Sequence, residues 1–331
     1  MKPYSLVAMA ALTFSALAEE PKPLAQLQDD FLSWKFGLFL HFNIATFNNE
    51  EWANGYEDPA TFAPDKLDCG QWADAARAAG MTYAVLTVKH TGGWCLWDSL
   101  VTAHDATAFI NYKKGKGDIV REFVDAFRAR GMKVGFYYCM PGNYSGKYGN
   151  TLPEGKPDLH GLPPEAAGDY TGFIEKQFTE LLTLYGPIDL LWIDQWGNGY
   201  TGKDWLQIKA HAKKLQPNCL VLANNAHTFK QTDLFGFELP VYKGKRVDEL
   251  VAADNEIATE VCDKLGPGWF WNEKRDEARL LSADEAAARL KVCNARRANY
   301  LLDVGPDKHG LLPEASVQRL KEIGKRLSSA E

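Results

Sequence analysis

Eight short apolar runs, most of them followed by an amphipathic segment, constrain the fold of this chain more than any other feature. The runs are nearly continuous in hydrophobicity, which is typical of parallel strands that are buried on both faces. The segments between them have the spacing of helices with one apolar face. Strands are predicted at residues 36–42, 83–88, 133–139, 188–193, 219–222, 234–237, 269–271 and 300–304, and helices at 71–79, 119–130, 172–185, 205–215, 283–297 and 314–326.

Strands that alternate with helices fit two α/β architectures, a (β/α)8-type TIM barrel and a doubly wound open sheet. An open sheet that binds nucleotides carries a glycine-rich fingerprint after a strand, and neither GxGxxG nor a P-loop occurs here. We therefore predict the barrel and keep the open sheet as the alternative. No linker rich in Pro, Gly and Ser divides the chain, so residues 19–331 are predicted to form one domain.

The first eighteen residues have the pattern of an export signal. Lys2 precedes an apolar run that ends in Ala16-Leu17-Ala18, the small-x-small form that signal peptidases cleave. A membrane anchor is the alternative, but it needs about 18 to 20 unbroken apolar residues, and Thr13 interrupts this shorter run. We predict a signal peptide at residues 1–18 and a secreted or periplasmic protein without membrane insertion.

Charge and cysteine usage exclude several classes of partner. The formal net charge is −6, and no basic cluster is longer than two residues, which argues against nucleic acid and anionic membranes. The six cysteines are widely spaced and form no CxxC pair, so a structural zinc site is not expected. Their sequence leaves open whether they form disulfides or stay as buried thiols. We expect no cofactor, and the sequence does not indicate an oligomeric state.

Polar residues that end apolar strands are candidates for the active site, because these ends form the mouth of a barrel. Two of them are histidines that could bind a metal, but the chain has no HxH or HExxH motif, so we predict no metal site. The candidates are His41, His90 after Lys89, the pair Tyr137-Tyr138, Asp194 and Glu238.

Asp194 stands out among these candidates because of the aromatic residues around it. At a strand end, an aspartate can also cap a helix or belong to an ion pair. Trp192, Trp196 and Tyr200 flank it, however, and proteins hold sugars by stacking the C–H faces on aromatic rings while carboxyl groups do the bond chemistry. The pattern favours a glycosidase.

Five motifs, in this order, resemble those of the α-L-fucosidases of glycoside hydrolase family 29. The resemblance covers nearly all of residues 19–331, and it is specific because the motifs occur jointly. They are WKFGLFLHFN at 34–43, TVKHTGGWCLWDS at 87–99, GKGDIVREF at 115–123, LLWIDQWGN at 190–198 and NYLLDVGPDKHGLLP at 299–313.

The resemblance implies a retaining exo-α-L-fucosidase that acts on a fucosylated oligosaccharide or glycoprotein glycan. Asp194 would be the nucleophile. Glu238 would be the acid/base, at the place where the branch restricted to α-1,3/4-fucosides has its glutamate, and Glu256 is the alternative. The implied fucose subsite contains His41, Glu51, Trp52, His90, Tyr138, Trp192 and Trp269, with Tyr137 as a substitute for Tyr138.

The chain also departs from the family pattern at three places. Phe42-Asn43 replaces the WG of the usual HWG, Thr91-Gly92 replaces the HD of KHHDG, and Asp303 stands where Asn is usual. The lost histidine motivates two alternatives: a glycan-binding barrel with weak or lost activity, and a glycosidase for a related sugar such as α-L-galactose. From the length of the chain we expect a catalytic domain without the C-terminal β-sandwich of many members.

Overall fold

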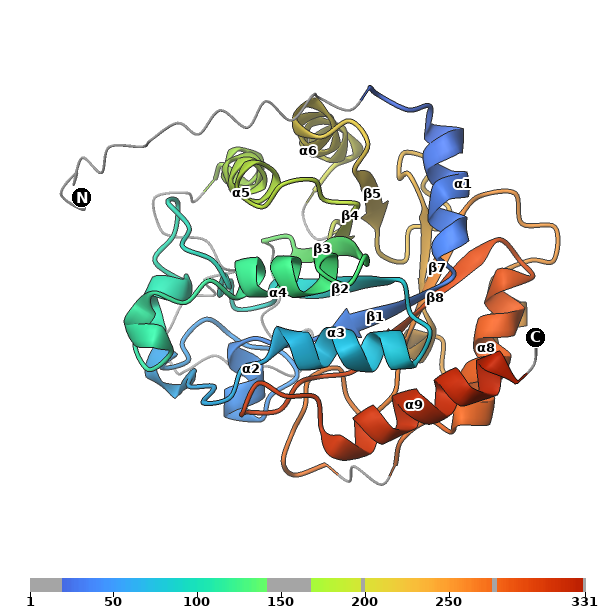
Figure 1. The fold of residues 1–331 in the computed structure, drawn as a ribbon. Coiled ribbons are helices and arrows are strands. Elements are labelled where there is room, and N and C mark those ends of the chain that lie inside the picture. The colour runs from blue at the N-terminus through green and yellow to red at the C-terminus, as the bar shows by residue number, and fades with distance from the viewer. Residues whose placement is uncertain (1–19, 142–167, 198–199, 276–278, 330–331) are drawn as a thin grey trace.

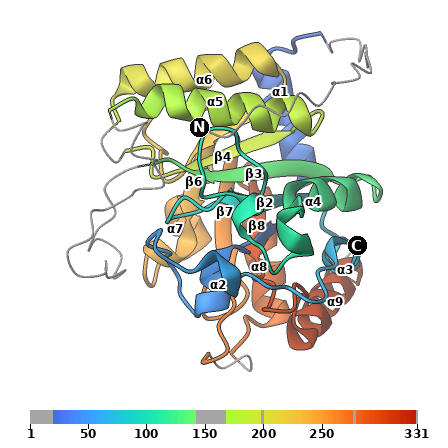
Figure 2. The same cartoon turned by 90° about the vertical axis from the view of Figure 1, so that its left-hand side faces the viewer.

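Eight parallel strands surround a common axis in the computed structural model, which describes residues 20–141, 168–197, 200–275 and 279–329. Helices cover the outside of this ring (Figures 1 and 2). The strands within the described ranges are Phe36–Leu40 (β1), Tyr83–Lys89 (β2), Lys133–Cys139 (β3), Leu190–Asp194 (β4), Leu220–Ala223 (β5), Phe235–Glu238 (β6), Thr259–Lys264 (β7) and Ala298–Asp303 (β8).

The strand order is β5-β4-β3-β2-β1-β8-β7-β6, so the first and last strands of the chain are neighbours. Parallel ladders join every adjacent pair in that order, with one register shift in the β2–β3 ladder between Thr87 and Lys89. The ring closes between β5 and β6, which the structure connects by one isolated bridge, Leu222 with Leu234. The predicted (β/α)8 barrel is confirmed, as a barrel that is nearly closed.

The helices follow the strands as the alternating pattern predicts. Side-chain caps begin most of the longer ones; Asp118, for example, accepts a hydrogen bond from the backbone N–H of Arg121. In the described ranges the helices are Leu24–Trp34 (α1), Ile44–Asn48 (α2), Cys69–Ala78 (α3), Ile119–Arg128 (α4), Tyr170–Leu184 (α5), Gly202–Leu215 (α6), Val247–Leu250 (α7), Ala283–Asn294 (α8) and Glu314–Ser328 (α9).

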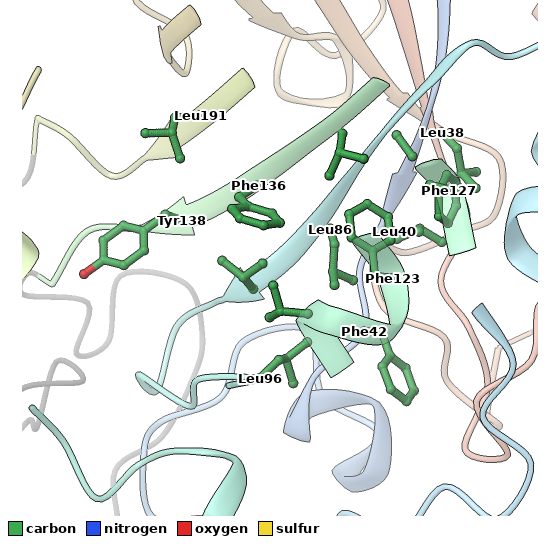
Figure 3. Close-up of a cluster of buried hydrophobic side chains, with 14 of the residues drawn as sticks. Leu38, Leu40, Phe42, Leu86, Leu96, Phe123, Phe127, Phe136, Tyr138 and Leu191 are labelled. Atoms are coloured by element: carbon green, nitrogen blue, oxygen red, sulfur yellow. The ribbon is translucent and has the colours of Figure 1, made fainter. Parts of the chain in front are cut away.

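Alternate residues of each strand enter two separate apolar layers. Side chains such as Leu38, Phe136 and Leu191 point outward and pack under the helices, as the close-up in Figure 3 shows. Their neighbours Phe39 and Tyr137 belong to a second cluster inside the barrel. Because the side-chain direction alternates, the residue number along a strand decides which layer a side chain enters.

The prediction for the seventh strand is wrong. Residues 269–271 lie in the loop that follows β7, and β7 itself is Thr259–Lys264. Its sequence, TEVCDK, has little continuous hydrophobicity because two of its acids are buried and hydrogen-bonded. Glu260 accepts hydrogen bonds from the Tyr83 hydroxyl at 2.6 Å and from the Trp192 indole N–H at 2.7 Å.

Glu260 lies beneath the pocket in the interior of the barrel. Burial raises its pKa to about 7, so the carboxyl group loses much of its tendency to ionise. Gly37 is required on β1 because a Cβ atom there would lie 2.4 Å from the ring of Tyr83. The hydrogen bonds of Glu260 to Tyr83 and Trp192 lie below the pocket. They depend on Gly37, which leaves room for the Tyr83 ring.

Two further expectations concern the N-terminus and the cysteines. The predicted signal peptide, residues 1–18, lies outside the described residues. All six cysteines are buried free thiols in the structure. Among the described residues, no helix is both long enough and apolar enough to cross a membrane.

Candidate active site

A pocket of about 390 Å³ opens at the carboxyl ends of the strands. This volume is in the usual range for small-molecule sites. The pocket brings together most of the residues predicted for the site: His41, Trp52, His90, Trp192, Asp194, Glu238 and Trp269. The remaining lining residues are Phe39, Tyr137, Gln195, Trp196, Gly197, Asn224, Asn225, Val241 and Cys262.

Asp194 is the last residue of β4, and several donors surround its carboxyl group. Its Oδ2 atom accepts a hydrogen bond from the Tyr137 hydroxyl at 2.8 Å. Its Oδ1 atom accepts from the backbone N–H of Gln195 at 2.8 Å and from the side-chain amide of Asn224 at 3.0 Å. These donors stabilise a negative charge on Asp194 and fix its direction in the pocket.

Glu238 is the last residue of β6 and lies in a different electrostatic environment. Burial, and then the negative charge of Asp194, raise its pKa to about 7, against the opposing effect of hydrogen bonds from Asn224 and Asn225. A carboxyl group with this pKa retains its proton near neutral pH and can donate it. The two carboxyl groups therefore lie in different environments, and Glu238 is the one that can act as an acid near neutral pH.

One amide nitrogen connects the two acids. Nδ2 of Asn224 donates to Asp194 Oδ1 and to Glu238 Oε2, each at 3.0 Å. Asn225 adds a second hydrogen bond to Glu238 Oε2 at 3.3 Å, and its own Oδ1 accepts from the Glu238 backbone N–H at 2.9 Å. The sequence analysis missed both asparagines. They directly follow the apolar strand β5, so the strand-end criterion that found Asp194 and Glu238 would have found them too.

His41 forms a buried pair with Asp303, the last residue of β8. Nδ1 of His41 lies 2.6 Å from Oδ1 of Asp303, and both side chains are almost fully buried. Burial lowers the pKa of His41 to about 3 and raises the pKa of Asp303 well above its usual value. A neutral carboxyl group then donates to Nδ1, and His41 presents an Nε2–H donor. The Oδ2 atom of Asp303 is buried without a hydrogen-bond partner among the described residues.

Aromatic rings stack along the inner face beside His41. The His90 ring stacks on Tyr137 at a centroid distance of 5.3 Å, and Tyr137 stacks on Trp192 at the same distance. Burial, and then the neighbouring His41, lower the pKa of His90 well below its usual value. This part of the pocket is consequently a flat, uncharged surface with hydrogen-bonding atoms at its edges.

The loop after β7 contributes Trp269, whose ring lies 5.0 Å from that of His41. Glu51 holds this loop. It accepts a hydrogen bond from the backbone N–H of Trp269 at 2.5 Å and forms an ion pair with Arg275 at 2.5 Å. Trp52, beside it in the chain, lines the pocket, whereas Glu51 does not. Glu51 thus positions Trp269 from outside the pocket wall.

The prediction for Tyr138 needs correction. Its side chain belongs to the outer apolar cluster with Phe136 and Leu191 (Figure 3). There its hydroxyl donates to Gln177 at 2.6 Å. Tyr137 takes its place in the pocket, since neighbouring residues on a strand face opposite sides. Glu256, the alternative acid, is exposed in the segment before β7, whereas Glu238 ends its strand in the pocket.

The two histidines of the pocket do not form part of a metal-binding cluster in the described structure. Their rings meet edge to face at 5.5 Å. Across the described ranges, no three His, Cys, Asp or Glu side chains are grouped so that they could hold a metal ion. The geometry supports chemistry by two carboxyl groups.

Comparison with known proteins relates this arrangement to one family. The family model described as "Alpha-L-fucosidase" matches residues 10–330. The Arabidopsis thaliana protein named "Alpha-L-fucosidase 1" is 26% identical over 98% of this chain, which spans only 65% of that relative, less than two thirds of its length.

Two solved structures resemble the described barrel. "Alpha-L-fucosidase isoenzyme 1 from Paenibacillus thiaminolyticus" has a TM-score of 0.69 and 26% identity, covering 92% of this chain and 76% of that one. The "Alpha-L-fucosidase AlfC from Lactobacillus casei", solved with α-L-fucose, has a TM-score of 0.74 at 20% identity, covering 92% of this chain and 99% of that one. At that identity, the second likeness concerns the fold alone.

Proposed function

The chain belongs to the α-L-fucosidase family, and on this basis we propose that it hydrolyses terminal α-L-fucosyl linkages with retention of configuration. In this proposal Asp194 is the nucleophile and Glu238 is the acid/base. The observation that carries it is the hydrogen bonding of the single Asn224 amide nitrogen to both carboxyl groups.

That shared amide limits how far apart the two acids can be. Both hydrogen bonds are 3.0 Å long, so Asp194 Oδ1 and Glu238 Oε2 cannot lie farther apart than twice that distance. Carboxyl groups are about 5 to 5.5 Å apart in retaining glycosidases and about 6.5 to 9.5 Å apart in inverting ones, which need room for a water molecule. The limit supports the retaining mechanism.

The reaction proceeds in two displacements. Asp194 attacks the anomeric carbon while Glu238 donates its proton to the leaving oxygen, and the glycosidic bond breaks as a fucosyl ester of Asp194 forms. Glu238, now ionised, takes a proton from water, which attacks the same carbon and releases Asp194. A pKa near 7 suits Glu238 for both steps, because the group must lose and regain one proton in each cycle.

The pocket wall supports a 6-deoxy sugar as the substrate. Trp269 provides an aromatic surface next to His41, and such a surface favours the sugar's methyl group. The Nε2–H donor of His41 can bind a hydroxyl group of the sugar. α-L-Galactose carries a hydroxyl in place of a methyl hydrogen, and it is therefore the informative competitor.

Linkage and location complete the proposal. The position of Glu238 at the end of β6 supports a preference for α-1,3/4-linked fucose on branched glycans, by its resemblance to that branch of the family.

The Ala16-Leu17-Ala18 sequence supports export and cleavage after residue 18. The mass of the protein recovered from the periplasm or the medium tests the cleavage, because an uncleaved product would contradict it.

The decisive experiment is hydrolysis of an aryl α-L-fucoside, followed by proton NMR to identify the first anomer released. We expect α-L-fucose to appear first. Asp194→Ala should lower the rate by roughly 10⁴-fold or more, because no nucleophile remains. Asp125→Asn, on the exposed face of α4, is the matched control and should keep wild-type activity.

The outcomes separate the parts of the proposal. β-L-Fucose as the first product would contradict retention, and full activity of Asp194→Ala would contradict its role. Cleavage of the α-L-galactoside in preference to the fucoside would contradict the sugar assignment. A panel of branched fucosylated oligosaccharides then tests the linkage, and equal rates on α-1,2, α-1,3, α-1,4 and α-1,6 linkages would contradict the preference.

A further inference from the structure

Trp196 follows the nucleophile by two residues and lines the pocket, yet neither the reaction nor the fucose subsite uses it. Its indole ring stacks on Phe229 at a centroid distance of 4.6 Å and an interplanar angle of 17°. Its Nε1–H donates to the backbone carbonyl of Asn224 at 2.9 Å, and Trp205 meets it edge to face at 5.9 Å. The ring is therefore fixed by Phe229, by Trp205 and along its N–H edge, and the part that remains lines the pocket.

The position of Trp196 relative to the two acids indicates which part of a substrate it meets. Glu238 gives its proton to the leaving oxygen, so the side chains around Glu238 on the mouth side face the leaving group. Asn224, whose carbonyl holds Trp196, is the residue whose amide joins Glu238 to Asp194. Trp196 is thus attached to the segment after β5, whose Asn224 amide hydrogen-bonds Glu238. The fucose-side rings lie elsewhere, His90 directly after β2 and Tyr137 on β3.

The residues near Trp196 indicate the chemistry of the leaving group. Val241, at the end of the turn that follows β6, lines the pocket with an apolar side chain that is 56% exposed. The amide side chains of Gln195 and Asn225 line the same part of the wall. An aromatic face, an apolar edge and neutral amides together match a pyranose ring, which has apolar C–H faces and hydroxyl groups around its rim.

The charged residues that line the pocket narrow the class of leaving-group sugar further. Of the described residues that line the pocket, none is Lys or Arg, and the acids among them are Asp194 and Glu238. An anionic sugar, such as a sialic acid or a sulfated hexose, would meet no lysine or arginine among these lining residues and would be repelled by the nucleophile. Lys264 lies on the side of Trp269, with its ammonium 5.6 Å from the centroid of that ring.

We propose that Trp196, together with Val241, forms a leaving-group subsite that binds a neutral pyranose ring, so that the preferred substrate is a fucosylated neutral oligosaccharide. This inference rests on the proposed fucosidase function. It adds the part of the substrate that the fucose pocket does not contact.

The test compares two substrates that share the fucosyl group. α-L-Fucosyl fluoride has no sugar as its leaving group, whereas a fucosylated trisaccharide of neutral hexoses has one. For Trp196→Ala we expect the ratio of kcat/KM on the trisaccharide to kcat/KM on the fluoride to fall roughly tenfold, the size of one lost aromatic contact. Trp196→Phe keeps a ring against Phe229 and should restore most of the ratio, which guards against a folding defect.

Leu100→Ala is the control for an exposed apolar residue outside the pocket, because Leu100 is 88% exposed and does not line it. Its ratio should match that of the wild type. If Trp196→Ala lowers kcat/KM on both substrates by the same factor, or on neither, the subsite is refuted while the fucosidase function stands. If the wild-type protein cleaves neither substrate, the proposed function itself fails.

Discussion

Strands β8, β1, β2 and β3 form one side of the pocket, and the ends of β4, β5 and β6 form the other. We call the first side the recognition wall, made of His41, His90 and Tyr137, and the second the chemistry wall, made of Asp194, Asn224, Asn225 and Glu238. Parallel ladders of at least four residue pairs join all strands of the recognition wall, with one register shift between Thr87 and Lys89 of β2. The chemistry wall contains the seam between β5 and β6, where a single bridge connects the strands.

The two walls also differ in backbone and charge. Gln195 and Asn225, both beside the reacting acids, have left-handed backbones with φ of 59° and 53°. Such conformations carry strain for residues other than glycine, and they occur at functional sites where surrounding contacts hold them. The recognition wall is neutral because burial suppresses the charge on both histidines. Backbone ladders thus position the rings of the recognition wall, whereas side-chain hydrogen bonds across the seam position the two carboxyl groups.

Replacing Glu238, the proposed proton donor, should have the largest effect on the chemistry wall. For Glu238→Gln we expect kcat/KM on an oligosaccharide to fall by roughly 10³- to 10⁴-fold, and less on a nitrophenyl fucoside, whose leaving group needs little protonation. Wild-type kcat/KM should decline as pH rises through about 7, because Glu238 then loses its proton.

The pH profile of the variant provides the check on this assignment. Glutamine has no proton to lose, so the decline near pH 7 should vanish in Glu238→Gln. Its persistence would assign the titration to another group. Glu256→Gln, at an exposed glutamate before β7, is the matched control and should behave as wild type.

Removing the bridging amide should have the next largest effect. Asn224→Ala deletes a hydrogen bond to each acid, and a bond to a charged group contributes about 1.5 to 3 kcal/mol, so kcat should fall roughly 10- to 150-fold. Because the lost bonds favour the ionised form of Glu238, the alkaline decline should move to higher pH.

Asn225→Ala sharpens this prediction, since its hydrogen bonds reach Glu238 and none of them reaches Asp194. Its effect on kcat should be smaller, with a similar direction of the pH shift. Equal losses in the two variants would show that the bridge between the acids has no special role.

The recognition wall should respond in KM more than in kcat. Asp303→Leu leaves His41 Nδ1 without its partner, and an unsatisfied buried group costs about 1 to 3 kcal/mol, so kcat/KM should fall by about 5- to 150-fold, chiefly through KM. Asp303→Asn can still donate to Nδ1 and should retain near-normal KM. A loss in kcat alone would place Asp303 with the chemistry wall.

The smallest effect should come from Tyr138→Phe, in the outer layer. It removes one buried hydrogen bond to Gln177, so the free energy of unfolding should fall by about 1 kcal/mol in urea titrations, with kcat/KM unchanged. Tyr137→Phe is the matched variant on the neighbouring residue. It removes the donor to Asp194 and should lower kcat/KM about tenfold or more. Similar activities for the two variants would contradict the division of the strand between the layers.

The sequence predicts this molecule well where polarity changes abruptly. Asp194 and Glu238 end apolar strands, and the structure brings both into one pocket. The prediction fails where polar groups are buried. Glu260 and Asp263 interrupt the apolar pattern of β7, and they can be buried there because the hydroxyl groups of Tyr83 and Tyr300 donate hydrogen bonds to them. The composition of a segment does not show whether residues elsewhere in the chain will hydrogen-bond its polar side chains.

The choice between Tyr137 and Tyr138 shows a second limit. Both are aromatic, and both are buried, so hydrophobicity cannot distinguish the inward from the outward residue. Register decides it, and register depends on pairing with β2 and β4, which a single sequence does not specify. The asparagines after β5 were accessible to the strand-end criterion but not to the search for acids, histidines and aromatics.

The neighbourhood of β1 and β8 has a consequence for synthesis of the chain on the ribosome. Strands β1 to β5 can pair one after another as they emerge, but β6, β7 and β8 join that sheet through the free edge of β1. Until residue 303 has been translated, the first strand keeps an unpaired edge that can attach to other nascent chains. The barrel is complete only when β8, the last strand to be translated, pairs with β1, the first. A chaperone that shields the β1 edge should therefore raise the yield of folded protein.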